Sequence, residues 1–194
     1  MNRSKANFKL KSKSISTSVP EISKFSPVPH EEDIADNKKA NDSKIKFNLN
    51  GELISTSAPA STRFSRVLRE EFGLTGTKIG CNAGDCGACT ILVNNKLICS
   101  CMMATQKADG CNIETIEGLQ NGCSVTNGKL QKSFLRHGAA QCGICTPGMV
   151  VSAEALLRKN PYPNEKEVKD AIGGVLCRCT GYRNIIKAIV NTNI

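Results

Sequence analysis

Eleven cysteines occur in this chain of 194 residues, and their spacing is the strongest chemical signal in the sequence. In the stretch CNAGDCGACT, Cys81, Cys86 and Cys89 are separated by four and then two residues, among glycines. Three thiols cannot all pair with one another, and the odd total argues against a closed disulfide framework. No apolar segment of a secretory signal follows the N-terminus, so we expect a cytoplasmic protein. In that reducing compartment clustered cysteines more often bind metal or carry out redox chemistry.

The first cysteine set has the spacing of the plant-type [2Fe–2S] ferredoxin loop, which takes its fourth ligand from a distant position. Such a loop wraps a small inorganic core and aims backbone N–H groups at sulfur, and Gly80, Gly84 and Gly87 permit the turns that this requires. Spacing leaves the fourth ligand open between Cys99 and Cys101, which would face the same way on an extended strand. Zinc also accepts four thiolates, but a gap of four and then two residues is atypical of its paired knuckles.

A second set consists of Cys142 and Cys145 in QCGIC and Cys177 and Cys179 in LCRCTGY. The 31 residues between the two pairs have a helical pattern, so four ligands converge on a second predicted metal centre. The first pair precedes a predicted helix, whose dipole favours thiolates. A thioredoxin-type redox pair is the alternative, but no βαβ pattern surrounds it and the second pair would remain unexplained.

Strands and one helix are predicted over residues 45–120. IKFNL alternates apolar and polar residues, as in a strand with one buried face, and Asn50-Gly51 is a hairpin signal. A helix with one apolar face is expected over residues 64–72, and two strands about Asn94-Asn95. NIETIEGL is expected to add a short edge strand.

Residues 121–194 predict four helices. The apolar face of the first helix consists of Leu130, Phe134 and Leu135, and the apolar face of the last helix begins at Tyr182. Thr146 is expected to cap the second helix ahead of a proline, and Asn164 with Glu167 forms a capping box for the third.

Residues 1–44 lack sustained periodicity and predict an N-terminal extension that is disordered or lies along a partner. The net charge is +9, but the chain has no Trp, two Tyr and six Phe, so a nucleic-acid partner is not expected. No run approaches the roughly 20 apolar residues of a membrane span.

Four stretches resemble the iron–sulfur subunit of the molybdenum hydroxylases, the xanthine oxidase family: GLTGTKIGCNAGDCGACTILVNNKLICSCM, KADGCNIETIEGL, QCGICTPGMVVSAEALL and LCRCTGYRNIIKAI. The resemblance covers roughly residues 44–192. It implies an α+β fold, with a plant-type ferredoxin-like (β-grasp) domain over residues 45–120. A four-helix [2Fe–2S] domain over residues 121–194 follows.

The resemblance also implies the metal ligands. The family places eleven residues between the third and fourth ligands of the first cluster, which gives Cys81, Cys86, Cys89 and Cys101. Its second cluster matches Cys142, Cys145, Cys177 and Cys179. Gln141 matches a glutamine that hydrogen-bonds the pterin of the large subunit, and Cys179 matches the ligand nearest that pterin. Cys99, Cys111 and Cys123 are interpreted as structural.

The implied function is electron transfer by single electrons through two [2Fe–2S] clusters. They would connect the molybdopterin centre of a large subunit with FAD in a medium subunit. No catalytic residue is expected in this chain, which shows no nucleophile with a paired base and no phosphate-binding or dinucleotide motif. The chain ends after the helical segment, whereas fused relatives continue into a flavin domain, so separate subunits are expected. The alternatives are a stand-alone two-cluster ferredoxin-like carrier and a structural zinc module.

Overall fold

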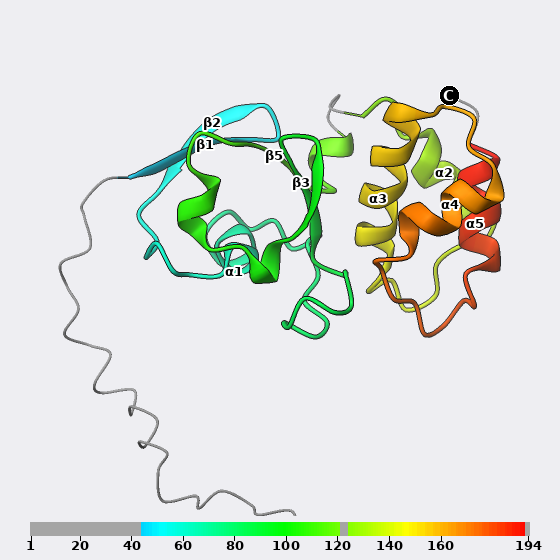
Figure 1. Cartoon of the computed structure of the whole chain (residues 1–194), viewed down its shortest axis with the longest axis horizontal. Helices are drawn as coiled ribbons and strands as arrows, with labels where there is room; N and C mark the ends of the chain where they lie inside the picture. Colours follow the sequence, from blue (N-terminus) through cyan, green and yellow to red (C-terminus); the bar gives the residue numbers. More distant parts are fainter. Residues whose placement is uncertain (1–43, 121–123, 193–194) are drawn as a thin grey trace, which may run out of the picture. The chain divides into compact units, whose positions relative to one another are not determined.

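The structure is a computed structural model that describes residues 44–120 and 124–192 (Figure 1). All of these residues belong to one unit, Ala40–Ile194. The predicted extension over residues 1–44 falls outside the described residues except at its last position, and Cys123 also falls outside them. The strands and α-helices in chain order are β1 Ile45–Leu49, β2 Glu52–Thr56, α1 Phe64–Glu70, β3 Thr90–Val93, β4 Lys96–Cys99, β5 Asn112–Glu114, α2 Lys129–Arg136, α3 Thr146–Lys159, α4 Glu165–Ile172 and α5 Arg183–Val190.

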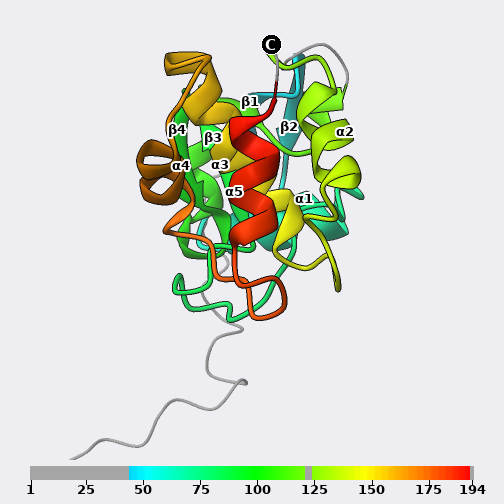
Figure 2. The same cartoon turned by 90° about the vertical axis from the view of Figure 1, so that its right-hand side faces the viewer.

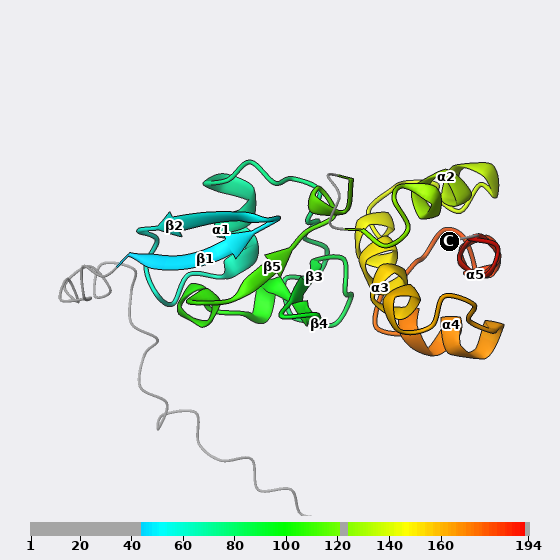
Figure 3. The same cartoon turned by 90° about the horizontal axis from the view of Figure 1, so that it is seen from above.

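The five strands form one mixed sheet in the order β2-β1-β5-β3-β4. Strand β5 pairs parallel with β1 and antiparallel with β3, whereas the β1–β2 and β3–β4 hairpins are antiparallel. The expectation that NIETIEGL forms an edge strand is therefore wrong, because β5 lies in the middle of the sheet (Figure 3). Ile113 of β5 is fully buried as a result.

The first core lies between the sheet and α1. Phe47 and Leu49 of β1 are buried, which confirms the alternation predicted for this strand. The Phe47 ring packs edge-on against Phe64 of α1, with ring centroids 5.4 Å apart. Both predicted hairpins are present, and their turn residues have the positive φ angles that such two-residue turns require, at Asn50-Gly51 and at Asn94-Asn95.

Strand β3 is buried on both faces and contributes to two cores. Ile91 and Val93 point into the first core, whereas Leu92 points into a second core made by the four helices. This explains why TILV has no polar residue except Thr90, since a strand covered on both faces needs no polar side. Helix α3 packs against β3 and joins the helices to the sheet.

The helices α2 to α5 enclose the second core, with α2 and α4 packed on α5 (Figure 2). The predicted capping box of α4 is confirmed, since the Asn164 side chain accepts from the Lys166 and Glu167 N–H groups. Two details of the prediction are wrong. Leu135 is 81% exposed, and the N-cap of α3 is Cys145, so Thr146 is already the first helical residue.

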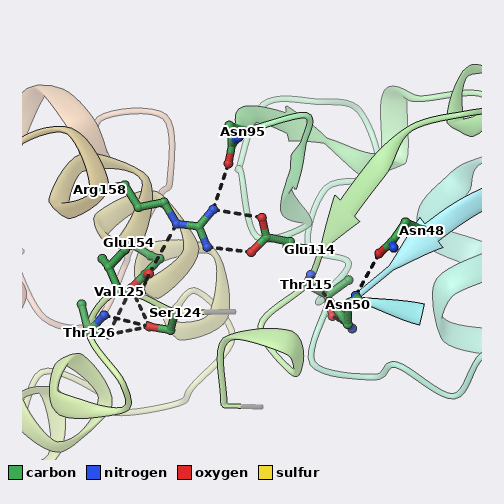
Figure 4. Close-up of polar contacts among 11 residues, drawn as sticks. Asn48, Asn50, Asn95, Glu114, Thr115, Ser124, Val125, Thr126, Glu154 and Arg158 are labelled. Carbon is green, nitrogen blue, oxygen red and sulfur yellow. Dashed lines mark hydrogen bonds and ion pairs between the residues drawn. The ribbon is translucent and has the colours of Figure 1, made fainter. Parts of the chain in front are cut away.

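A buried ion network ties the end of α3 to the sheet and to the segment before α2 (Figure 4). The Arg158 guanidinium donates to both carboxylate oxygens of Glu114 on β5, at 2.9 and 2.6 Å. Glu154, one turn earlier on α3, accepts from the Val125 N–H at 2.6 Å and from the Ser124 hydroxyl at 2.9 Å. Because its members are largely buried, removing one charge would leave another without compensation.

None of the helices in residues 44–120 and 124–192 has the length and apolar character needed to cross a bilayer.

Candidate metal centres

The first ligand set, Cys81, Cys86, Cys89 and Cys101, is assembled by the loop before β3 and the 3₁₀ turn after β4. The β3–β4 hairpin pairs Thr90 with Cys99, and this brings the residues flanking the hairpin together. Ser100 secures the junction, because its N–H and its hydroxyl both donate to the Cys89 carbonyl, at 3.2 and 2.7 Å. Cys89 and Cys101 are each 2% exposed, and we call them the inner pair.

Cys81 and Cys86 form the outer pair of this set and lie nearer the surface. Each receives the other's backbone N–H on its sulfur, at 3.3 and 3.4 Å, and the Ala83 N–H also points at the Cys81 sulfur, at 3.3 Å. These backbone donors, Ala83 first, lower the pKa of the Cys81 thiol to about 7. A side chain at Gly80 would place its Cβ 2.8 Å from the Cys86 sulfur, so a larger residue here would force that sulfur to shift.

Cys99 and Cys101 do not share one strand face, contrary to expectation. Strand β4 ends at Cys99, and Cys101 lies in the 3₁₀ turn Ser100–Met102. The Cys99 thiol contacts the Gly84 carbonyl at 3.7 Å, and burial raises its pKa. Burial likewise raises the pKa of Cys101 to about 11, so its thiolate would need a nearby positive charge. Cys111 lies apart from both sets and donates to the Lys107 carbonyl at 3.3 Å.

The second ligand set, Cys142, Cys145, Cys177 and Cys179, joins the start of α3 to the α4–α5 connection. It repeats the arrangement of the first set. The exposed Cys142 and Cys179 form the outer pair, with their sulfurs 3.5 Å apart. The less exposed Cys145 and Cys177 form the inner pair.

The predicted effect of the helix dipole does not dominate at Cys145. Although this residue caps α3, burial raises the pKa of its thiol to about 12. Burial acts in the same direction on Cys177, but hydrogen bonds from the Thr180 hydroxyl and backbone outweigh it and lower the pKa of Cys177. Within this inner pair, local hydrogen bonds thus favour ionisation of Cys177, whereas burial opposes ionisation of Cys145.

Tyr182 organises the loop of the second set, a role that its sequence position did not reveal. Its hydroxyl accepts the Cys177 N–H at 2.8 Å and lies 3.3 Å from the Val175 carbonyl, to which it donates. Its backbone is left-handed, with φ of 65°, and it lies just before α5 instead of on the helix stripe. A bulky residue adopts this conformation only where surrounding contacts compensate its strain.

The donor arrangement suits binuclear clusters. Each set presents two pairs of thiols, and a [2Fe–2S] cluster has two irons that take two cysteines each. Paired thiols and N–H groups directed at sulfur are what such a cluster requires.

The two ligand sets are in direct backbone contact. The Leu176 N–H, next to Cys177, donates to the Cys86 carbonyl at 2.9 Å. A Cβ added at Gly87 would lie 2.0 Å from the Gly174 carbonyl oxygen, so the two chain segments touch without side chains between them. A single hydrogen bond therefore connects a ligand residue of one set to the neighbour of a ligand in the other.

Comparison with family models divides the described chain into two iron–sulfur regions. Residues 47–114 match the 2Fe-2S iron-sulfur cluster binding domain, and residues 115–190 match the [2Fe-2S] binding domain. These matches confirm the predicted order, a ferredoxin-like domain followed by a helical [2Fe–2S] domain in an α+β fold.

Several characterised proteins are similar over most of this region. A probable xanthine dehydrogenase subunit of Bacillus subtilis (strain 168) is 48% identical over 121 residues, which cover 62% of this chain and 68% of the relative. The nicotinate dehydrogenase small FeS subunit of Eubacterium barkeri is 49% identical over 125 residues, covering 63% and 76%. Among solved structures, quinoline 2-oxidoreductase from Pseudomonas putida 86 superposes with a TM-score of 0.72 at 45% identity, covering 77% of this chain and 91% of that one.

Proposed function

This chain belongs to the iron–sulfur small subunits of the molybdenum hydroxylases, the xanthine oxidase family, and from that premise we propose how it transfers electrons. It is the electron-transfer subunit of a molybdenum-dependent oxidoreductase. The first ligand set holds one [2Fe–2S] cluster, and the second ligand set holds the other. The observation that carries this assignment is the presence of two outer and two inner thiol pairs in loops that contact each other.

The chain's own residues bind the clusters, shield them and hold them in series. Cys89, Cys101 and Cys145 of the inner pairs are buried, so water is excluded from this side of each ligand set, while backbone N–H groups of Cys81 and Cys86 stabilise negative charge on sulfur. When bound, each [2Fe–2S] cluster accepts and donates one electron. The hydrogen bond from the Leu176 N–H to the Cys86 carbonyl joins the two loops directly, and we assign it to the coupling of the clusters.

The residues exposed around each ligand set support an assignment of one partner subunit to each set. Gln141, Cys142 and Cys179 are exposed together with Ile144, so this face is assigned to the molybdopterin-binding large subunit, with Gln141 and Cys179 toward the pterin. Exposed apolar residues also flank the first set at Ile79 and Met102, and that face is assigned to the FAD-binding medium subunit. A contiguous exposed apolar patch is typical of a surface that a partner covers.

We divide the chain at the positions that the sequence indicated. Residues 1–44 are an extension, residues 45–120 a ferredoxin-like domain and residues 121–194 a helical domain. The two family models meet between residues 114 and 115 and the molecule has two separate cores, and both observations support a boundary in this part of the chain. The cytoplasm is the proposed compartment, since reduced thiols are needed for cluster binding.

Iron analysis and EPR of anaerobically purified protein test the assignment. We expect a red-brown protein with about four irons per chain and two distinguishable signals after reduction, since each cluster contains two irons. Zinc in place of iron, without visible absorption, would reject it. Purification from native cells tests the partners, because isolation as a lone monomer would instead indicate a stand-alone carrier.

A further inference from the structure

Arg63 lies just before α1 and is held beside the first ligand set by a short antiparallel contact. Residue 63 bridges to Ala104, the Phe64 N–H donates to the Met103 carbonyl at 2.8 Å, and the Thr105 N–H donates to the Thr62 carbonyl at 2.9 Å. This second segment directly follows the turn that carries Cys101. The backbone of Arg63 is therefore fixed relative to the fourth ligand of the first set.

The Arg63 side chain joins the two ends of that set. Its Nη1 donates to the Cys101 carbonyl at 3.2 Å and also to the Asn82 carbonyl. Asn82 follows Cys81 and has a left-handed backbone, with φ of 56°, a conformation that a non-glycine residue adopts at some cost. One guanidinium thus connects the outer pair to the inner pair through two main-chain oxygens.

The positive charge of Arg63 is expected to have a second effect, on the reduction of the cluster. Reduction adds one negative charge to an iron–sulfur cluster, and a fixed cation nearby favours the more negative form. Asp85, exposed in the same loop, has the opposite charge and the opposite expected effect. Both contacts come from the single nitrogen Nη1, and a lysine at this position would keep the charge but end in a compact ammonium instead of a planar guanidinium.

We propose that Arg63 is a positioning residue of the first cluster, which holds its ligand loop and raises its reduction potential relative to a neutral side chain. This inference rests on the proposed function, because it assumes a [2Fe–2S] cluster at the first set. It assigns to Arg63 no contact with substrate or with a partner. The predicted effect is confined to one of the two clusters.

The test is a redox titration of the purified complex, followed by EPR, for Arg63→Met, Arg63→Lys and the control Arg66→Met. Arg66 lies on the adjoining helix α1 and pairs with Glu70 at 2.7 Å, with both side chains well exposed. Arg63→Met should lower the one-electron reduction equilibrium constant of one cluster by about three- to tenfold, where tenfold corresponds to about 59 mV. Arg63→Lys should keep part of this effect, and the control should change neither cluster.

Two further measurements separate the causes. Asp85→Asn should move the midpoint of the same EPR signal upward, which identifies that signal as the first cluster. Added salt should reduce the shift in Arg63→Met, because an exposed charge is screened. Loss of this signal alone in Arg63→Met, with the second signal intact, would also support the positioning role.

Unchanged midpoints in Arg63→Met, or equal shifts of both clusters, would overturn the inference. Its failure is distinguishable from failure of the proposed function, because the unmodified protein must first show about four irons and two signals. If that protein contains both clusters and the Arg63 variants leave them unaltered, only the role of Arg63 is refuted.

Discussion

Gly148 lies in the first turn of α3, where the helical half of the chain meets the first ligand loop. A Cβ at this position would lie 2.6 Å from the Gly87 carbonyl oxygen and 3.3 Å from a methyl group of Val175. The oxygen belongs to the backbone and cannot rotate away. The substitution Gly148→Ala therefore tests whether α3 packs against the first ligand loop as described.

The expected change in the free energy of unfolding of Gly148→Ala follows from two opposing effects. Alanine is favoured over glycine within a helix by about 1 kcal/mol. Against this, α3 and the loop must separate by at least 0.4 Å, from 2.6 to 3.0 Å, before the new methyl group is tolerated. Overpacking of this kind costs about 1–3 kcal/mol, and a backbone obstacle places it near the upper value. The net loss of stability is about 2 kcal/mol.

Differential scanning calorimetry of the anaerobic, cluster-loaded protein measures this change. For a chain of this size, a loss of about 2 kcal/mol lowers Tm by about 4–8 °C. Gly174→Ala is the matched control, because it lies in the same interface but its Cβ would meet nothing within 4 Å. A Tm of Gly148→Ala equal to or above that of the unmodified protein, with Gly174→Ala unchanged, would refute the described contact.

Three further tests, made with five substitutions, address the ligand loops and the ion network. Tyr182→Phe removes the acceptor of a ligand N–H, so we expect a loss of about 1–3 kcal/mol and an altered EPR signal of the second cluster only. Glu154→Gln, at a carboxylate 1% exposed, should lower the free energy of unfolding by about 2–4 kcal/mol, as measured by urea unfolding. Glu165→Gln, at an exposed carboxylate, should lower it by less than about 0.5 kcal/mol. Cys101→Ser should lose the first cluster, and Cys99→Ser should retain about four irons, as measured by iron analysis.

Contradictory results for these variants are equally specific. Equal changes in both EPR signals of Tyr182→Phe would indicate a general loss of structure. Equal stabilities of the two glutamine variants would mean that the network around Arg158 is not buried in solution. Retention of both clusters in Cys101→Ser, with loss in Cys99→Ser, would reverse the choice of the fourth ligand.

Local patterns predicted much of the fold because the interactions involved are short in sequence. The NG and NN hairpins and the capping box at Asn164 each depend on residues within a few positions, and all are present. The central position of β5 was missed, because its parallel pairing with β1 joins Asn48 to Asn112 and only three residues form the strand. The periodicity of a short segment carries no information about which distant strand it will pair with.

The metal centres, like the fold, were predicted from the sequence only where short-range patterns define them. Cysteine spacing indicated which thiols could act together, because ligand sets leave a direct mark on sequence. The contributions of Arg63, Leu176 and Tyr182 depend on backbone groups that the fold brings near them, so residue type alone could not identify them. The exposure of Leu135 was likewise missed, because an apolar residue at the edge of the apolar face of a helix can be either buried or exposed.

The double burial of β3 has a consequence for protein engineering. Ile91 belongs to one core and Leu92 to the other, so a truncation after the sheet would strip one face of a central strand. The two halves match separate family models, yet neither is an interchangeable module. A chimera that takes its sheet from one relative and its helices from another would have to carry over both sides of this shared strand as a matched set.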